Sequence, residues 1–182
     1  MDANSLFSDK GLALLPTPLA ISLRAYRDEG SQQGPQFALL KLWKACEAVE
    51  LLLRFLVCIS IGELHARGKL TGEVVGRLRE KIRQPTLGIW RAMLIDDVVP
   101  LISSADTIFP ELPKTAKETL SVFLDGRKKT RDIMSSFSDL RNRLAHGAGL
   151  TTIRWCRRLT PCYMVQVSKV VASSWRRVRS VS

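Results

Sequence analysis

The chain has 182 residues, of which 46% are hydrophobic and 25% are charged. This is the composition of an ordinary globular protein, and it excludes intrinsic disorder as a description of the whole chain. The formal net charge is +11, from 28 Lys and Arg against 17 Asp and Glu. Much of this excess lies in residues 150–182, which hold six arginines, Lys169 and no acidic residue. The charge favours a polyanionic partner, although it says little about nucleic-acid binding by the first 149 residues.

Neither a membrane span nor a secretory signal is predicted. The longest apolar stretch, residues 48–61, contains Glu50 and Arg54 and is shorter than the ~18 uncharged residues that a span needs. The four cysteines form no CxxC motif, and the two histidines are His65 and His146. We therefore expect no metal site, no cofactor, no membrane partner and a cytoplasmic location.

Residues 1–36 are expected to be an N-terminal extension, which proline and glycine interrupt and which has room for a short helix over 19–27. A long central helix is predicted from Phe37 to Leu64, because apolar residues dominate and no Pro or Gly occurs before Gly62. Charged residues recur in it at steps of three or four and form one polar stripe: Lys41, Lys44, Glu47, Glu50 and Arg54.

Gly68 is expected to end the central helix, and Thr71 to begin the next one. The buried face of that next helix is predicted to carry Val74, Val75, Leu78 and Ile82. Its basic residues are Arg77, Arg79, Lys81 and Arg83. They form either a solvated face or a surface that contacts phosphate.

Three further helices are predicted before residue 150. Thr86 caps a helix that Pro100 bends or ends, with Leu87, Trp90, Leu94, Val98 and Leu101 buried. After a loop over 103–113, the next helix closes at Gly126 and buries Leu112, Ala116, Leu120 and Phe123. Thr130 opens the last, which ends at His146-Gly147 and buries Ile133, Phe137, Leu140 and Leu144. The predicted fold is all-α, an up-and-down bundle of about five helices.

Residues 150–182 do not continue this pattern. They are free of acid and rich in Arg, Trp and Cys, and one more amphipathic helix is conceivable from Val167, Val170, Val171, Trp175 and Val178. One interpretation is a basic tail for nucleic acid. The other is a truncation or a change of reading frame that replaces a native closing helix.

Arg141, Asn142 and His146 form the constellation that points to chemistry, at the end of the last predicted helix. Asn142 and His146 are four residues apart and share one side of a helix. Arg141 lies five residues before His146, which places its Cα ~140° around the helix and ~7.5 Å along it. Only the length of its side chain, or a second copy of the motif, would bring the guanidinium near the imidazole. The motif therefore makes better chemical sense where two copies of the chain meet.

These residue types fit metal-independent cleavage of RNA. A base activates the 2′-OH for in-line attack on the adjacent phosphate, and an acid protonates the leaving 5′-oxygen. Histidine transfers protons near neutral pH. Arginine offers phosphate a permanently charged fork, and asparagine can orient the histidine or the phosphate.

The pattern Arg141-Asn142-x-x-x-His146 resembles the Rx4–6H motif of HEPN domains, helical modules whose name stands for "higher eukaryotes and prokaryotes nucleotide-binding". The resemblance covers residues 37–149, including the segment 85–90. It implies a homodimeric endoribonuclease of a toxin or defence system, with the two motifs facing each other across a shared cleft. Arg141 and His146 would be catalytic, and Asn142 would orient them.

The sequence departs from the family pattern in two ways, one of which concerns control by an antitoxin and the other the helix that follows the motif. Some HEPN toxins carry a tyrosine two residues after the histidine, which a nucleotidyltransferase antitoxin modifies, whereas this chain has Ala148. That form of control is therefore not expected, and another antitoxin or a fused domain stays open as a partner. The helix that follows the motif in the family would have to come from residues 150–182.

Four basic residues precede the motif in the sequence: Arg127, Lys128, Lys129 and Arg131. They form either a solvated turn or a weak RNA-binding site. A rival to the whole nuclease hypothesis is a non-catalytic module that dimerises or recruits RNA or a protein, since a fold can be kept without its activity.

Overall fold

The computed structural model describes residues 8–29, 35–102, 110, 112–126 and 136–146. Within these ranges the chain forms helices and no strand, which confirms the predicted all-α fold. The helical segments are α2 (Asp9–Leu12), α3 (Thr17–Glu29), α4 (Pro35–Ala66), α5 (Gly72–Ile82), the run of α6 (Leu87–Ala92), η1 (Met93–Val98) and η2 (Val99–Leu101), the run of α7 (Leu112–Thr115), η3 (Ala116–Leu120) and α8 (Ser121–Asp125), and α9 (Phe137–Ala145). The described part thus has seven helical segments against the expected bundle of about five. The two additional segments lie within the first 36 residues, where α3 covers the short helix expected over 19–27 and α2 was not predicted.

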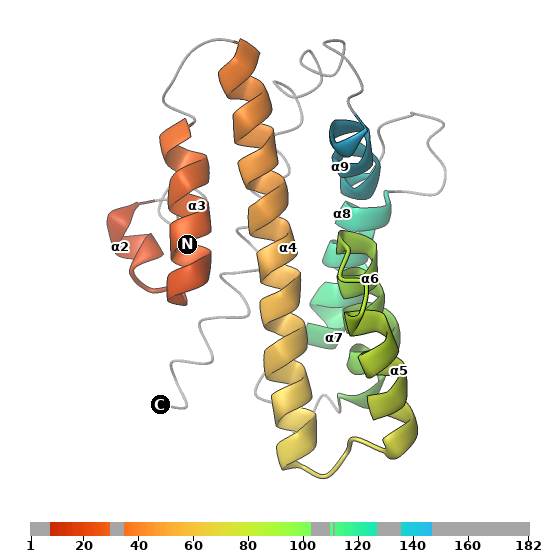
Figure 1. Cartoon of the computed structure of the whole chain (residues 1–182). Coiled ribbons are helices and arrows are strands. Elements are labelled where there is room, and N and C mark those ends of the chain that lie inside the picture. Colours follow the sequence, from red (N-terminus) through yellow and green to blue (C-terminus); the bar gives the residue numbers. More distant parts are fainter. Residues whose placement is uncertain (1–7, 30–34, 103–109, 111, 127–135, 147–182) are drawn as a thin grey trace.

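The central helix α4 organises the other elements. Figure 1 shows α2 and α3 on one side of it and α5 to α9 on the other. The predicted polar stripe is present, and within it Lys44 pairs with Glu47 at 2.9 Å and Arg54 pairs with Glu50. Another side of α4 faces the core, and its buried residues include Leu42, Val49, Leu53, Leu56 and Val57.

Gly68 ends α4 as predicted. Its φ of 64° lies in the left-handed region that glycine adopts without strain. The Lys69 N–H donates to the Leu64 carbonyl at 2.9 Å, and the Gly68 N–H donates to the His65 carbonyl at 2.9 Å. This pair of bonds is the Schellman arrangement, which satisfies carbonyls that a helix end otherwise leaves free.

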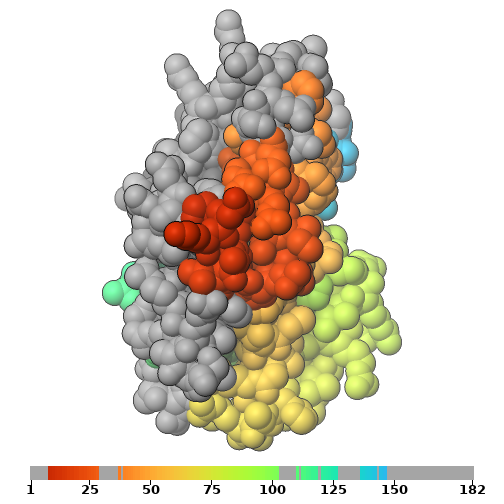
Figure 2. All heavy atoms as spheres, turned by 90° about the vertical axis from the view of Figure 1, so that its left-hand side faces the viewer, coloured from red at the N-terminus to blue at the C-terminus, as the bar shows by residue number. Residues whose placement is uncertain are grey.

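The segment expected to be an extension packs into the core. Leu19, Leu23 and Tyr26 of α3 are buried where α3 lies along α4. Figure 2, seen from this side, shows α2 and α3 at the surface in front of α4. Burial raises the pKa of Tyr26 to about 12, because the ionised phenolate loses its hydration there. The apolar face of α3 therefore belongs to the same core as α4.

The short helix α2 is tied to α3 by an ion pair. Arg27 of α3 donates to the Asp9 carboxylate at 2.8 Å. This hydrogen bond, more than the charge alone, holds the pKa of Asp9 below its ordinary value. The Arg27 side chain is 33% exposed and that of Asp9 is 78% exposed. Because water and salt screen such a pair, it orients α2 more than it stabilises the bundle.

The predicted cap of α5 is confirmed, but two of the four residues predicted to be buried on this helix, Val75 and Ile82, are not buried. Thr71 Oγ1 accepts a hydrogen bond from the Val74 N–H at 3.4 Å. Val74 and Leu78 are buried, whereas Val75 is half-buried and Ile82 is 47% exposed. At 100° per residue, Lys81 lies closer than Ile82 to the centre of the Val74–Leu78 face. Lys81 can occupy this position on the side that packs against the bundle because its ammonium pairs with the buried carboxylate of Asp97 on η1.

The next run begins and ends where the sequence predicts. Thr86 caps α6 by accepting from the Ile89 N–H at 3.3 Å, and the four apolar residues Leu87, Trp90, Leu94 and Val98 are buried. Leu101, predicted to be buried, is only half-buried. The backbone widens to a π-helix over η1 and tightens to a 3-10 turn over η2, which contains Pro100 and ends the run.

The run from α7 to α8 buries the residues that its spacing predicted: Leu112, Ala116, Leu120 and Phe123. It begins at Leu112, inside the expected loop over 103–113, and it ends at Gly126, whose φ is 75°. In the described part of the chain, no helix combines the length and the apolar character that crossing a membrane requires.

Candidate functional site

The helix that carries the motif begins later than predicted. Ser136 has an extended backbone, with φ −131° and ψ 152°, and its Oγ accepts a hydrogen bond from the Asp139 N–H at 3.0 Å. A single helix from Thr130 to His146 is therefore wrong, because this cap interrupts it. Thr130 and Ile133 lie outside the described residues. The pattern Ser136-x-x-Asp139 is a capping signal that could have shown the true start.

Three buried side chains hold α9 on the bundle. Phe137, Leu140 and Leu144 are at most 7% exposed, and they follow the predicted apolar spacing. The Phe137 ring stacks on the Phe123 ring of α8, with centroids 4.8 Å apart and an interplanar angle of 27°. The position of the motif therefore depends on the packing of α9 against α8 and α4.

The motif residues lie on two different sides of α9. Asn142 and His146 are exposed, and their spacing of four places them on one side, as predicted. His146 caps the helix, and its N–H donates to the Asn142 carbonyl at 3.0 Å. Arg141 is half-buried and lies ~140° around the helix from His146. Among the described residues, no hydrogen bond joins the Arg141 side chain to His146.

An additional carboxylate shares the side of α9 that carries Asn142 and His146. Asp139 is exposed and stands three residues before Asn142 and seven before His146, a spacing that returns to nearly the same side of a helix. It occupies the first turn, where an acid complements the helix dipole. This spacing was readable in the sequence, although Asp139 was not among the predicted site residues.

The predicted weak RNA-binding residues are Arg127, Lys128, Lys129 and Arg131, and all four lie outside the described residues. The basic face of α5 is described, and its cations are mostly paired. Lys81 Nζ lies 2.6 Å from Asp97, whose side chain is 7% exposed, and Arg77 contacts both Asp97 and Glu73. Arg83 pairs with Glu80 at 3.1 Å. Much of the positive charge of α5 is thus neutralised by carboxylates of the same chain.

A second charged cluster connects three elements of the bundle. Arg91 of α6 lies 2.6 Å from Asp125 at the end of α8 and 3.0 Å from Asp96 of η1. One arginine between two carboxylates fixes the end of α8, which precedes the motif helix in the chain. We assign this cluster a structural role, because each of its charged groups has a partner.

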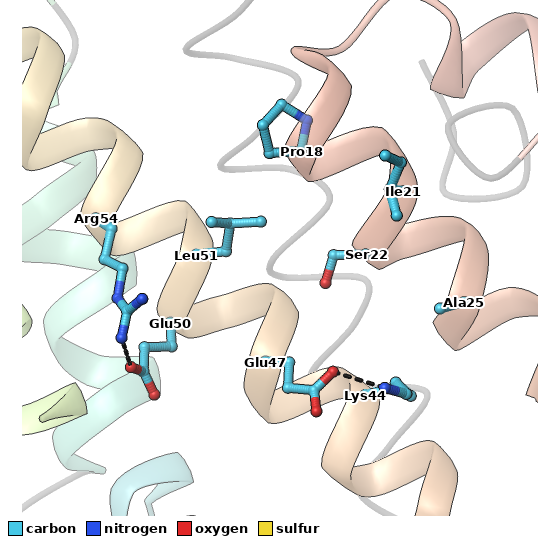
Figure 3. A pocket seen from close by; sticks show the side chains of 9 residues that line it. All are labelled: Pro18, Ile21, Ser22, Ala25, Lys44, Glu47, Glu50, Leu51 and Arg54. Carbon is cyan, nitrogen blue, oxygen red and sulfur yellow. Dashed lines mark hydrogen bonds and ion pairs between the residues drawn. The ribbon is translucent and has the colours of Figure 1, made fainter.

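A groove of about 540 Å³ lies between α3 and α4. Figure 3 shows the residues that line it: Pro18, Ile21, Ser22, Ala25, Lys44, Glu47, Glu50, Leu51 and Arg54. The charged members form two ion pairs on the α4 wall, one of Lys44 with Glu47 and one of Arg54 with Glu50. Its charges are therefore matched internally, and none of the motif residues lines it.

The described residues contain no group of three or more His, Cys, Asp or Glu side chains placed to hold a metal ion. The two described cysteines are Cys46, which is buried, and Cys58, which is exposed. The motif on α9 is thus the constellation that most clearly suggests chemistry in this part of the chain. No protein-family model, curated protein or solved structure matches the chain.

Proposed function

We propose that the chain is a metal-independent endoribonuclease of HEPN type that acts on RNA in the cytoplasm as part of a toxin or defence system. The observation that supports this proposal is the position of the motif at an accessible helix end. Asn142 and His146 are exposed at the C-terminal end of α9, next to Leu140 and Leu144, which are buried. An RNA strand can approach these polar side chains without displacing the core.

The reaction that these groups would perform is an internal transesterification. A base removes the proton from the 2′-OH, the oxygen attacks the adjacent phosphorus, and the bond from phosphorus to the 5′-oxygen breaks. An acid returns a proton to that oxygen, so the products are a 2′,3′-cyclic phosphate and a 5′-hydroxyl. His146 supplies the proton transfer, Arg141 stabilises the charge that develops on the phosphate, and Asn142 orients the reacting groups.

The proposal includes a homodimer. Arg141 and His146 of one α9 lie on different sides of the helix, and Arg141 is half-buried. A second copy would bring its own Arg141 to the His146 of the first, and such a shared site fits the closed two-fold symmetry that most homo-oligomers have.

The test is cleavage of a mixed single-stranded RNA by the full chain in EDTA, followed by analysis of the fragment ends. The wild type is expected to produce 2′,3′-cyclic phosphate ends, and Arg141→Ala is expected to abolish them while helicity and dimerisation persist. Arg79→Ala is the matched control, because Arg79 is an exposed arginine on α5. A folded wild-type dimer that cleaves no RNA would contradict the proposal and favour a non-catalytic dimerisation or binding module.

Mixing two inactive variants tests the shared site separately. If a reaction needs Arg141 of one copy and His146 of the other, a dimer of Arg141→Ala with His146→Ala keeps one intact site of two. After subunit exchange the mixture should regain roughly a quarter of the wild-type rate, since half of the dimers are mixed. A mixture of folded, exchanging variants that stays inactive would contradict the shared site.

A further inference from the structure

We draw no further inference here: the strongest candidate, the groove between α3 and α4 that Ile21 and Leu51 line, has its charged side chains paired with one another, and nothing in the structure shows what covers it.

Discussion

The ring of Phe137, the first residue of α9, stacks on the ring of Phe123 in α8 with 4.8 Å between their centroids. This contact connects the run that ends at Gly126 to the helix that carries Arg141, Asn142 and His146. The placement of the candidate site therefore depends on an aromatic pair that takes no part in the proposed chemistry.

Phe137→Ala is expected to destabilise the fold by about 3–5 kcal/mol, the usual cost of removing a buried phenylalanine ring and leaving a cavity. Val122→Ala on α8 is the matched control, because Val122 is 40% exposed, and it should cost less than about 1 kcal/mol. Urea unfolding of both variants measures the difference. Equal and small losses would mean that α9 is not held by this contact.

Ser136→Ala is expected to lower the free energy of unfolding by about 1 kcal/mol, because the Asp139 N–H loses its acceptor at the start of α9. Ser138→Ala is the control, since Ser138 lies in the first turn of the same helix and does not cap it. The comparison uses chemical denaturation at one pH. A larger loss in Ser138→Ala than in Ser136→Ala would place the start of the helix elsewhere.

Lys81→Met is expected to cost about 1–3 kcal/mol, because Asp97 is nearly buried and would lose the ammonium that lies 2.6 Å away. Arg79→Met replaces an exposed cation on the same helix and should change stability by less than about 0.5 kcal/mol. Thermal or urea unfolding distinguishes the two. If both variants were equally stable, the basic face of α5 would be solvated throughout and Asp97 would not depend on it.

The stability of the bundle should fall at alkaline pH through Tyr26. Its pKa is raised to about 12 in the folded chain, whereas an exposed tyrosine titrates near ~10. The contribution of Tyr26 to the unfolding free energy is fully present below pH ~10 and is lost as the pH rises towards ~12, because the tyrosine of the unfolded chain releases its proton first. The expected slope is ~1.4 kcal/mol per pH unit, and Tyr26→Phe should remove it.

The measurement is the unfolding free energy of the wild type and of Tyr26→Phe at several values between pH ~9 and ~11.5. The unfolding free energy of the wild type should fall more steeply with pH than that of the variant. The variant serves as the control for the other groups that titrate in this range. Parallel curves would contradict the packing of α3 against α4.

Several helix caps and most of the apolar positions of the bundle were predictable because they depend on neighbouring residues. Thr71 and Thr86 cap where expected, and Gly68 ends α4 with a positive φ. The π-helical segments η1 and η3 were not predicted, because a helix with one extra residue in a turn still buries apolar residues at nearly the same spacing. The start of α9 was missed because Ser136 and Thr130 are both good capping residues and the apolar spacing does not choose between them. The acid three residues after Ser136, which Thr130 lacks, is the local signal that favours Ser136.

Part of the candidate site was predictable for the same local reason. A spacing of four residues places Asn142 and His146 on one side of α9, whatever surrounds the helix. The half-burial of Arg141 could not be predicted, because it depends on how α9 sits against the rest of the bundle. The ion pairs of the buried Asp97 could not be predicted either, because its partners Arg77 and Lys81 lie on a different helix.

The nuclease proposal is tested most directly by the rates at which His146→Ala and His65→Ala cleave RNA in EDTA. Both histidines are exposed and lie at a helix end, so the two substitutions should perturb the fold to a similar, small extent. Since general acid–base catalysis contributes about 10²–10⁴-fold, His146→Ala should lose at least about 100-fold, and His65→Ala should stay within about 2-fold of the wild type. Equal rates for the two folded variants would contradict a catalytic role for His146.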